Sequence, residues 1–354
     1  MFEPPVQHDQ ALEILRRLAH SAFRHWGLEP AELSLIKFRE NAVFKVVTQH
    51  GERFALRIHR GGYHCDRALD SELQWMAALQ RAGFDVPTIV PTVDGRLFAT
   101  DSVEGLAAPL QVDVFEWIEG HQLGTSENGL GDDLQNIEAT YRTVGNLAAR
   151  LHNHAASWTL PGGFQRHAWD RDGLVGEQPF WGRFWELEAL SAQQRSLLIE
   201  ARDLVRQEML SLAGTADMAQ CYGLIHADFV PENLFVSGGQ VRLLDFDDAG
   251  FGWHLFELAT ALYFIQNDPN YPTAKAALVA GYREHRDLPD ALLDKLPVFM
   301  MARGFTYLGW VHTRPGSEEG KALAPYLIDL ACRFAERFVG RGQDMVAPVE
   351  VPAG

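Results

Sequence analysis

The chain has 354 residues, of which 47% are hydrophobic, and this length allows two compact domains, each with a core of its own. A formal net charge of −16 excludes functions that depend on binding a nucleic-acid backbone, because phosphate binding needs a basic surface. The cysteines (Cys65, Cys221 and Cys332) are too far apart for a disulfide framework or a zinc site, and no apolar run reaches about 18 residues, so we expect a reduced, cytoplasmic protein without a membrane partner.

The first part of the chain has the pattern of a helix followed by short strands. Apolar residues at helical spacing predict an amphipathic helix over residues 8–26, closed by Gly27. The elements that we expect next are strands over residues 34–39, 42–48 and 53–59, a helix over 67–82, and strands over 85–93, 96–102 and 110–118. We place the end of this N-terminal domain, residues 1–120, at Gly120.

The second domain, residues 121–354, is mostly helical in pattern. The predicted helices cover residues 132–154, 193–212, 253–266, 273–285, 291–311 and 322–339. A β-rich hairpin interrupts them near residues 234–246. The expected fold class is therefore α+β, with a small antiparallel sheet domain before a larger, mainly helical one.

The segment from His226 to Asp248 carries the residues that indicate chemistry. In kinase active sites one Asp orients the substrate hydroxyl and accepts its proton, while an Asn five residues on and a second Asp beyond a hairpin hold magnesium. Asp228, Asn233 and Asp245 have this spacing. The pattern therefore predicts Asp228 as the catalytic residue, and Asn233 and Asp245 as metal ligands.

A hairpin gives this spacing a geometric reason. The run Ser237-Gly238-Gly239-Gln240 is a turn signal between two β-rich runs, and folding there places Asn233 opposite Leu244 or Asp245. Paired strands lie about 5 Å apart and Mg²⁺ takes oxygen ligands at about 2.1 Å, so one ion can bridge the two side chains.

Two other interpretations of this segment stay open. In the first, the three residues are an ordinary turn residue, a cap and a strand-end charge. In the second, His226-x-Asp228 and Asp245-x-Asp247 are metal ligands of a hydrolase, although the further histidines that such sites usually need are missing.

The segment resembles the aminoglycoside phosphotransferase and choline kinase-like superfamily of small-molecule kinases. The likeness extends from about Leu33 to Phe338 and is sharpest between Asp228 and Asp245. It implies a protein-kinase-like fold, with a small β-rich lobe, a hinge, a larger helical lobe and ATP in the cleft. ATP and Mg²⁺ are the cofactors that follow from it.

The resemblance also implies roles for residues around the motif. His226 would brace the catalytic segment rather than react. Glu257 stands where relatives often have Asp and would anchor this segment to the start of a helix. Asp247 and Asp248 are candidates for contacts around magnesium or with the substrate.

The parts that would bind ATP depart from the usual pattern in two places. Arg57 stands where the superfamily has a strand Lys that touches the phosphates, with Glu72 placed as its acidic partner. The loop over residues 38–44 has no glycine, so phosphate contacts there would come from Asn41 or Arg39. The backbone amides that would bind adenine belong to Glu116, Trp117 and Ile118.

We expect the acceptor to be the hydroxyl of a small, cationic, amino-bearing metabolite such as homoserine, a hydroxylated amino acid or an amino alcohol, or an aminoglycoside. No Ala-Pro-Glu segment follows the motif to build a peptide platform. From His121 onward 30 Asp and Glu outnumber 19 Lys and Arg, which favours a cationic substrate. A protein Ser/Thr kinase of the bacterial stress-response type and a non-catalytic pseudokinase stay as alternatives, and the sequence does not distinguish ATP from GTP or indicate an oligomeric state.

Overall fold

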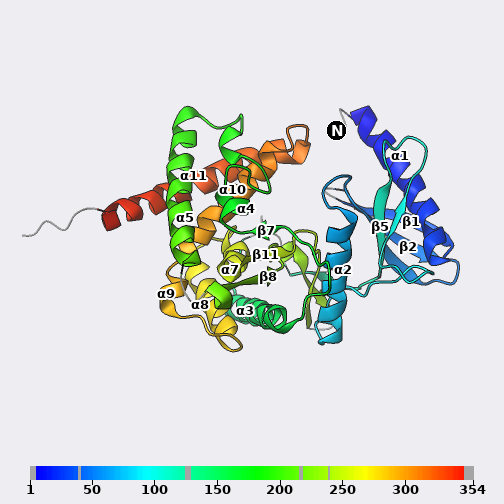
Figure 1. Cartoon of the computed structure of the whole chain (residues 1–354), viewed down its shortest axis with the longest axis horizontal. Helices are drawn as coiled ribbons and strands as arrows, with labels where there is room; N and C mark the ends of the chain where they lie inside the picture. Colours follow the sequence, from blue (N-terminus) through cyan, green and yellow to red (C-terminus); the bar gives the residue numbers. More distant parts are fainter. Residues whose placement is uncertain (1–4, 39–40, 124–128, 215–217, 238–239, 347–354) are drawn as a thin grey trace, which may run out of the picture. The chain divides into compact units, whose positions relative to one another are not determined.

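The structure is a computed structural model that describes residues 5–38, 41–123, 129–214, 218–237 and 240–346 (Figure 1). The chain forms two compact units. Unit 1 consists of Met1–Leu123, Thr159–Arg166 and Glu232–Asp247, and unit 2 consists of Gly124–Trp158, His167–Pro231 and Asp248–Gly354. The domain boundary that we place at Gly120 stays a prediction.

Unit 1 is built on a five-stranded antiparallel sheet with strand order β1-β2-β3-β5-β4. A second sheet, of order β10-β9-β6, contains the motif hairpin. The elements are α1 (Pro5–Ala22), β1 (Pro30–Phe38), β2 (Ala42–Thr48), β3 (Arg53–Ile58), α2 (Asp66–Arg81), β4 (Ala99–Asp101), β5 (Leu110–Glu116), β6 (His121–Gln122), β9 (Leu234–Ser237) and β10 (Gln240–Leu243).

The core of unit 1 lies between the five-stranded sheet and α1, which runs along the strands in Figure 1. Leu18 of α1 packs in one cluster with Phe44, Leu56 and Val114 of the strands, and all four are fully buried or nearly so. Because successive side chains of a strand point to opposite faces, the neighbour of Leu56 on β3, Arg57, lies on the other face. The sheet thus has one face that packs on the core with α1 and a second face that carries Arg57 and Asp113.

The predicted strand over residues 85–93 is wrong. Among the described residues, this range forms no ladder: it meets β5 at an isolated bridge between Ile89 and Phe115, flanked by bonds from the Val90 amide to the Val114 carbonyl and from the Glu116 amide to the Thr88 carbonyl. Pro87 and Pro91 explain the difference, because each removes a backbone donor that a strand ladder would use. The next predicted strand is shorter than expected and is confined to β4.

Unit 2 is mainly helical, and α10 packs against α5, α7 and α11 in its interior. A small sheet of order β7-β11-β8, which the sequence did not predict because its strands are so short, completes the unit. The elements are α3 (Leu134–Ser157), β7 (Ala168–Trp169), α4 (Arg171–Val175), α5 (Ala192–Ala213), α6 (Met218–Cys221), β8 (Tyr222–Ile225), β11 (Gly250–Trp253), α7 (His254–Leu262), α8 (Tyr271–Arg283), α9 (Asp290–Leu293), α10 (Leu296–His312) and α11 (Glu318–Val346).

The predicted α+β fold class is confirmed by this combination of antiparallel sheets and helices. Among the described helices, none combines the length and the apolar character that crossing a bilayer requires.

Candidate functional site

The motif hairpin in unit 1 has one of the two predicted registers. Leu243 pairs with Leu234, and the Leu244 amide continues the ladder by donating to the Asn233 carbonyl at 2.8 Å. Asn233 therefore lies opposite Leu244, one residue before Asp245. The turn residues Gly238 and Gly239 lie outside the described part of the chain.

Asp245 leaves the hairpin in a left-handed backbone conformation, with φ of 60°, which Asp tolerates better than most residues. Its side chain is 41% exposed, whereas Asn233 is buried. One amide and one carboxylate are thus brought to the same end of the ribbon. Oxygen donors of this kind are what Mg²⁺ takes from proteins, so the residues fit the ion that the motif implies.

Arg57 is buried and is bonded to two carboxylates of unit 1. Its Nη2 donates to Glu72 Oε1 at 2.8 Å and to Asp113 Oδ2 at 2.7 Å, and its Nε donates to Asp113 Oδ1 at 3.1 Å. The predicted Arg57–Glu72 pair is present, and Asp113 is a second partner. The remaining nitrogen, Nη1, lies 3.9 Å from Asp245 Oδ1.

Two histidines continue this buried network from Asp113 to Asp247. His59 Nε2 lies 2.9 Å from Asp113 Oδ2, and its Nδ1 lies 3.8 Å from Asp247 Oδ1. Burial and the Arg57 charge lower the pKa of His59, but the Asp113 and Asp247 carboxylates together raise it to about 9. Burial likewise disfavours the charged form of Asp247, yet His59 and His64 beside it hold its pKa below the usual value.

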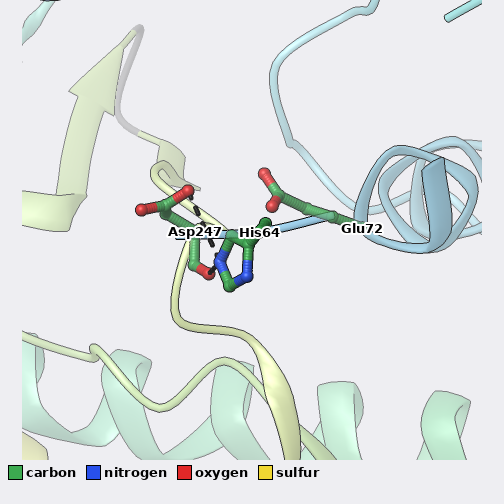
Figure 2. Close-up of side chains that lie close together, drawn as sticks. All are labelled: His64, Glu72 and Asp247. Atoms are coloured by element: carbon green, nitrogen blue, oxygen red, sulfur yellow. Dashed lines mark hydrogen bonds and ion pairs between the residues drawn. The ribbon is translucent and has the colours of Figure 1, made fainter. Parts of the chain in front are cut away.

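His64, Glu72 and Asp247 lie close enough together to be considered as a metal site (Figure 2). The His64 ring donates from Nε2 to the Asp247 carbonyl at 2.7 Å. Glu72 is bonded to Arg57 and also to Arg166, at 3.3 Å. The guanidinium groups of Arg57 and Arg166 therefore already neutralise the Glu72 carboxylate. We assign His64, Glu72 and Asp247 a structural role rather than a role as metal ligands.

Most of the other unit 1 groups that we predict to bind the nucleotide make hydrogen bonds within the protein. The Asn41 side-chain oxygen accepts from the Arg60 amide at 3.1 Å. The Glu116 and Trp117 amides donate to the carbonyls of Thr88 and Arg53. The Ile118 amide makes no backbone hydrogen bond with any described residue, and the adenine contact of the three residues stays a prediction.

Arg39 and Glu40, in the loop expected over the phosphates, lie outside the described residues.

In unit 2, Asp228 is paired with Arg303 of α10. Arg303 Nη2 donates to Asp228 Oδ1 at 2.8 Å, and Nη1 donates to the Ala227 carbonyl at 3.1 Å. Arg303 is fully buried, its guanidinium stacks near the Tyr307 ring, and the Tyr307 hydroxyl accepts a further bond. The Asp228 side chain, which is 23% exposed, is thus oriented by a fixed positive group.

The backbone before Asp228 is strained and is held in place by hydrogen bonds to Glu257. Ala227 has φ of 65°, a region that costs a non-glycine residue about 1–2 kcal/mol. Both oxygens of Glu257, on α7, accept from this backbone, at 2.8 Å from the His226 amide and 2.7 Å from the Ala227 amide. Burial raises the pKa of Glu257 to about 7. The His226 ring accepts from the Asp228 amide through Nδ1 at 3.2 Å.

Asp248 is held through its backbone. Its carbonyl accepts from His167 Nε2 at 3.0 Å and from Trp169 Nε1 at 2.8 Å.

Among the residues that sequence reasoning missed and that contact the candidate groups, Asp113 and Arg303 were the ones with a sequence signal. Each was signalled by a lone charge inside an apolar run, Val112-Asp113-Val114-Phe115 and Met301-Ala302-Arg303-Gly304-Phe305. A charge that must be buried needs a partner, so such positions deserve a search for one. Arg166, which joins α2 to residues 246 and 247, carried no comparable signal.

Comparison with known proteins identifies the family of the chain. The model of the phosphotransferase enzyme family matches residues 35–292, which is well over half of the sequence. The chain belongs to the phosphotransferase enzyme family. This membership confirms the predicted enzyme class, a phosphotransferase with an alcohol group as acceptor, and the resemblance on which that prediction rested.

Several relatives of this phosphotransferase are kinases. It is 23% identical to the amicoumacin kinase of Bacillus subtilis over 88% of the chain and 90% of the relative. It is 26% identical to the homoserine kinase of Sinorhizobium medicae over 78% and 79%. The solved structure of a microcompartment-associated aminopropanol kinase superposes with a TM-score of 0.80 at 33% identity, covering 91% of this chain and 97% of that one.

Proposed function

We propose that this phosphotransferase transfers the γ-phosphoryl group of ATP to the hydroxyl of a small, amino-bearing metabolite. The observation that carries the proposal is the bond from the Leu244 amide to the Asn233 carbonyl, which brings an amide and the Asp245 carboxylate to one end of a hairpin. Asp228, five residues before Asn233, supplies the carboxylate that aligns the substrate hydroxyl and accepts its proton.

Each residue has a definite task in this proposal. Asn233 and Asp245 hold Mg²⁺, and Arg57 contacts the phosphates through the nitrogen that faces Asp245. When bound, the metal and nucleotide supply charge neutralisation and the phosphoryl donor. Asp228, oriented by Arg303, aligns the acceptor hydroxyl and takes its proton.

The substrate class rests on charge and on relatives. The acidic balance from His121 onward favours a cation, and two relatives are named for substrates that carry an amino group, homoserine and aminopropanol. We therefore propose amino alcohols and hydroxylated amino acids first, and aminoglycosides second. A cytoplasmic location fits such a substrate and the spacing of the cysteines.

A screen of acceptors tests this function. ADP release is measured with Mg²⁺-ATP over amino alcohols, hydroxylated amino acids, aminoglycosides and matched compounds that lack the amine. We expect release with an amino-bearing acceptor and a clear loss when the amine is removed. Radiolabel from γ-labelled ATP that enters only protein would indicate a protein kinase instead, and tight nucleotide binding without turnover on any acceptor would indicate a pseudokinase.

The metal assignment has its own test. Asp245→Ala should abolish the part of ADP binding that depends on Mg²⁺, because the ion loses its carboxylate ligand. Calorimetry with and without Mg²⁺ measures this, and Glu32→Ala on the exposed side of β1 serves as the control. Unchanged magnesium dependence in Asp245→Ala would remove Asp245 from the metal site.

A further inference from the structure

On the second face of the unit 1 sheet, two carboxylates hold Arg57. Arg57 on β3 pairs directly with Asp113 on β5, so their side chains stand on the same face as neighbours. Asp113 is fully buried and meets the guanidinium with both oxygens, at 2.7 and 3.1 Å. This is the two-point geometry that a planar guanidinium forms with a carboxylate and an ammonium does not.

The Asp113 and Glu72 carboxylates accept hydrogen bonds along one edge of the Arg57 guanidinium. Nε and Nη2 are bonded to Asp113 and Glu72, and Nη1 is left facing Asp245, whose Oδ1 is 3.9 Å away. The Phe115 ring, 5.3 Å from the guanidinium carbon, closes another side. The group therefore has little freedom to rotate.

We propose that Asp113 is a positioning residue for nucleotide binding, which fixes Arg57 so that Nη1 faces the phosphates. The inference rests on the proposed function, since it assumes that Arg57 contacts the nucleotide. It makes Arg57 and Asp113 an interdependent pair. A lysine at position 57 has a single nitrogen, and in the presence of Asp113 that nitrogen would be held by the two carboxylates.

This interdependence gives a test by a double-mutant cycle. The dissociation constant of Mg²⁺-ADP is measured by calorimetry for the wild type, Asp113→Asn, Arg57→Lys and the double variant, together with each melting temperature. We expect Asp113→Asn to weaken binding about tenfold, because a two-point charged bond is lost. In the Arg57→Lys background the same change should cost less than about twofold, or improve binding, because it frees the ammonium.

Two further variants separate positioning from charge and from stability. Asp113→Glu keeps the charge but moves the carboxylate by one methylene, so it should also weaken ADP binding. Asp101→Asn is the matched control, since Asp101 is a buried acid of the same sheet, on β4, with an ion pair to Arg24. We expect it to lower the melting temperature without changing ADP affinity.

The outcomes distinguish this inference from the proposed function. If the wild type does not bind Mg²⁺-ADP, the proposed function fails. If the wild type binds but Asp113→Asn and Asp113→Glu bind equally well, or if Asp113→Asn costs the same factor with Lys at position 57, Asp113 does not act through Arg57 and the inference is overturned. Asp113→Glu answers the question even where Asp113→Asn does not fold.

Discussion

His59 should make the stability of the protein depend on pH between about 6.5 and 9. The side chain is 4% exposed; burial lowers its pKa, but the Asp113 carboxylate, 2.9 Å away, and the Asp247 carboxylate together raise it to about 9. Below pH 6.5 the imidazolium is charged in both the folded and the unfolded state, so its stabilising pairing is fully present. As the pH rises through 9 the folded state loses that charge, and the stabilisation is lost.

The size of the effect follows from the two pKa values. A rise from 6.5 to about 9 corresponds to about 3 kcal/mol of unfolding free energy, present at pH 6 and absent at pH 10. His59→Gln removes the titrating group and should therefore remove this part of the pH dependence. The other groups that titrate in this range are common to both proteins and cancel in the difference.

The assay is urea unfolding of the wild type and His59→Gln at pH 6 and pH 10. We expect the difference in unfolding free energy between the two proteins to shrink by about 3 kcal/mol from the lower to the higher pH. His50→Gln, in the exposed turn after β2, is the control and should follow the wild type. Equal pH dependence in His59→Gln and the wild type would refute the assignment of a charged, buried His59.

Three further changes test the framework around Asp228 and the helical unit. Arg303→Met should lower the unfolding free energy by about 3 kcal/mol, because it leaves the Ala227 carbonyl and the Asp228 carboxylate without their buried partner; a loss below about 0.5 kcal/mol in chemical denaturation would contradict this. Ala227→Gly should raise it by about 0.5–1 kcal/mol, since glycine adopts a φ of 65° without strain; a lower melting temperature would argue against stored strain. Gly145→Ala should lower the unfolding free energy by about 3 kcal/mol, because its Cβ would lie 1.9 Å from the Leu278 carbonyl oxygen where α3 meets α8. The control Gly162→Ala, whose Cβ would meet nothing within 4 Å, should leave the unfolding free energy nearly unchanged. Similar melting temperatures for the two variants would contradict the close packing of the two helices.

The parts that the sequence predicted best depend on local signals. The turn run between two β-rich segments limited the hairpin to two registers, and the observed pairing of Leu243 with Leu234 is one of them. The Arg57–Glu72 pair was implied by the family resemblance, which places a basic residue on a strand and its acidic partner on the next helix, and the bond between the two is present. The strand expected over residues 85–93 does not form because Pro87 and Pro91 each remove a backbone donor that a strand ladder needs.

The parts that the sequence did not predict depend on partners far apart in the chain. Arg303 reaches Asp228 from 75 residues away, and Asp113 reaches Arg57 from 56 residues away. Neither spacing belongs to a local pattern, since such pairs are decided by how helices and strands pack. A lone charge in an apolar run shows that a partner exists but does not identify it.

The central claim is that Asp228 aligns the acceptor hydroxyl and accepts its proton during phosphoryl transfer. The variant Asp228→Asn tests this claim most directly. On the acceptor found by the ADP-release screen, we expect this variant to lower kcat by about 10² to 10⁴ while its affinity for Mg²⁺-ADP stays within about twofold of the wild type. Asp203→Asn, an exposed acid on α5 of the same unit, should keep full turnover. Full turnover in Asp228→Asn on the same acceptor would contradict the account.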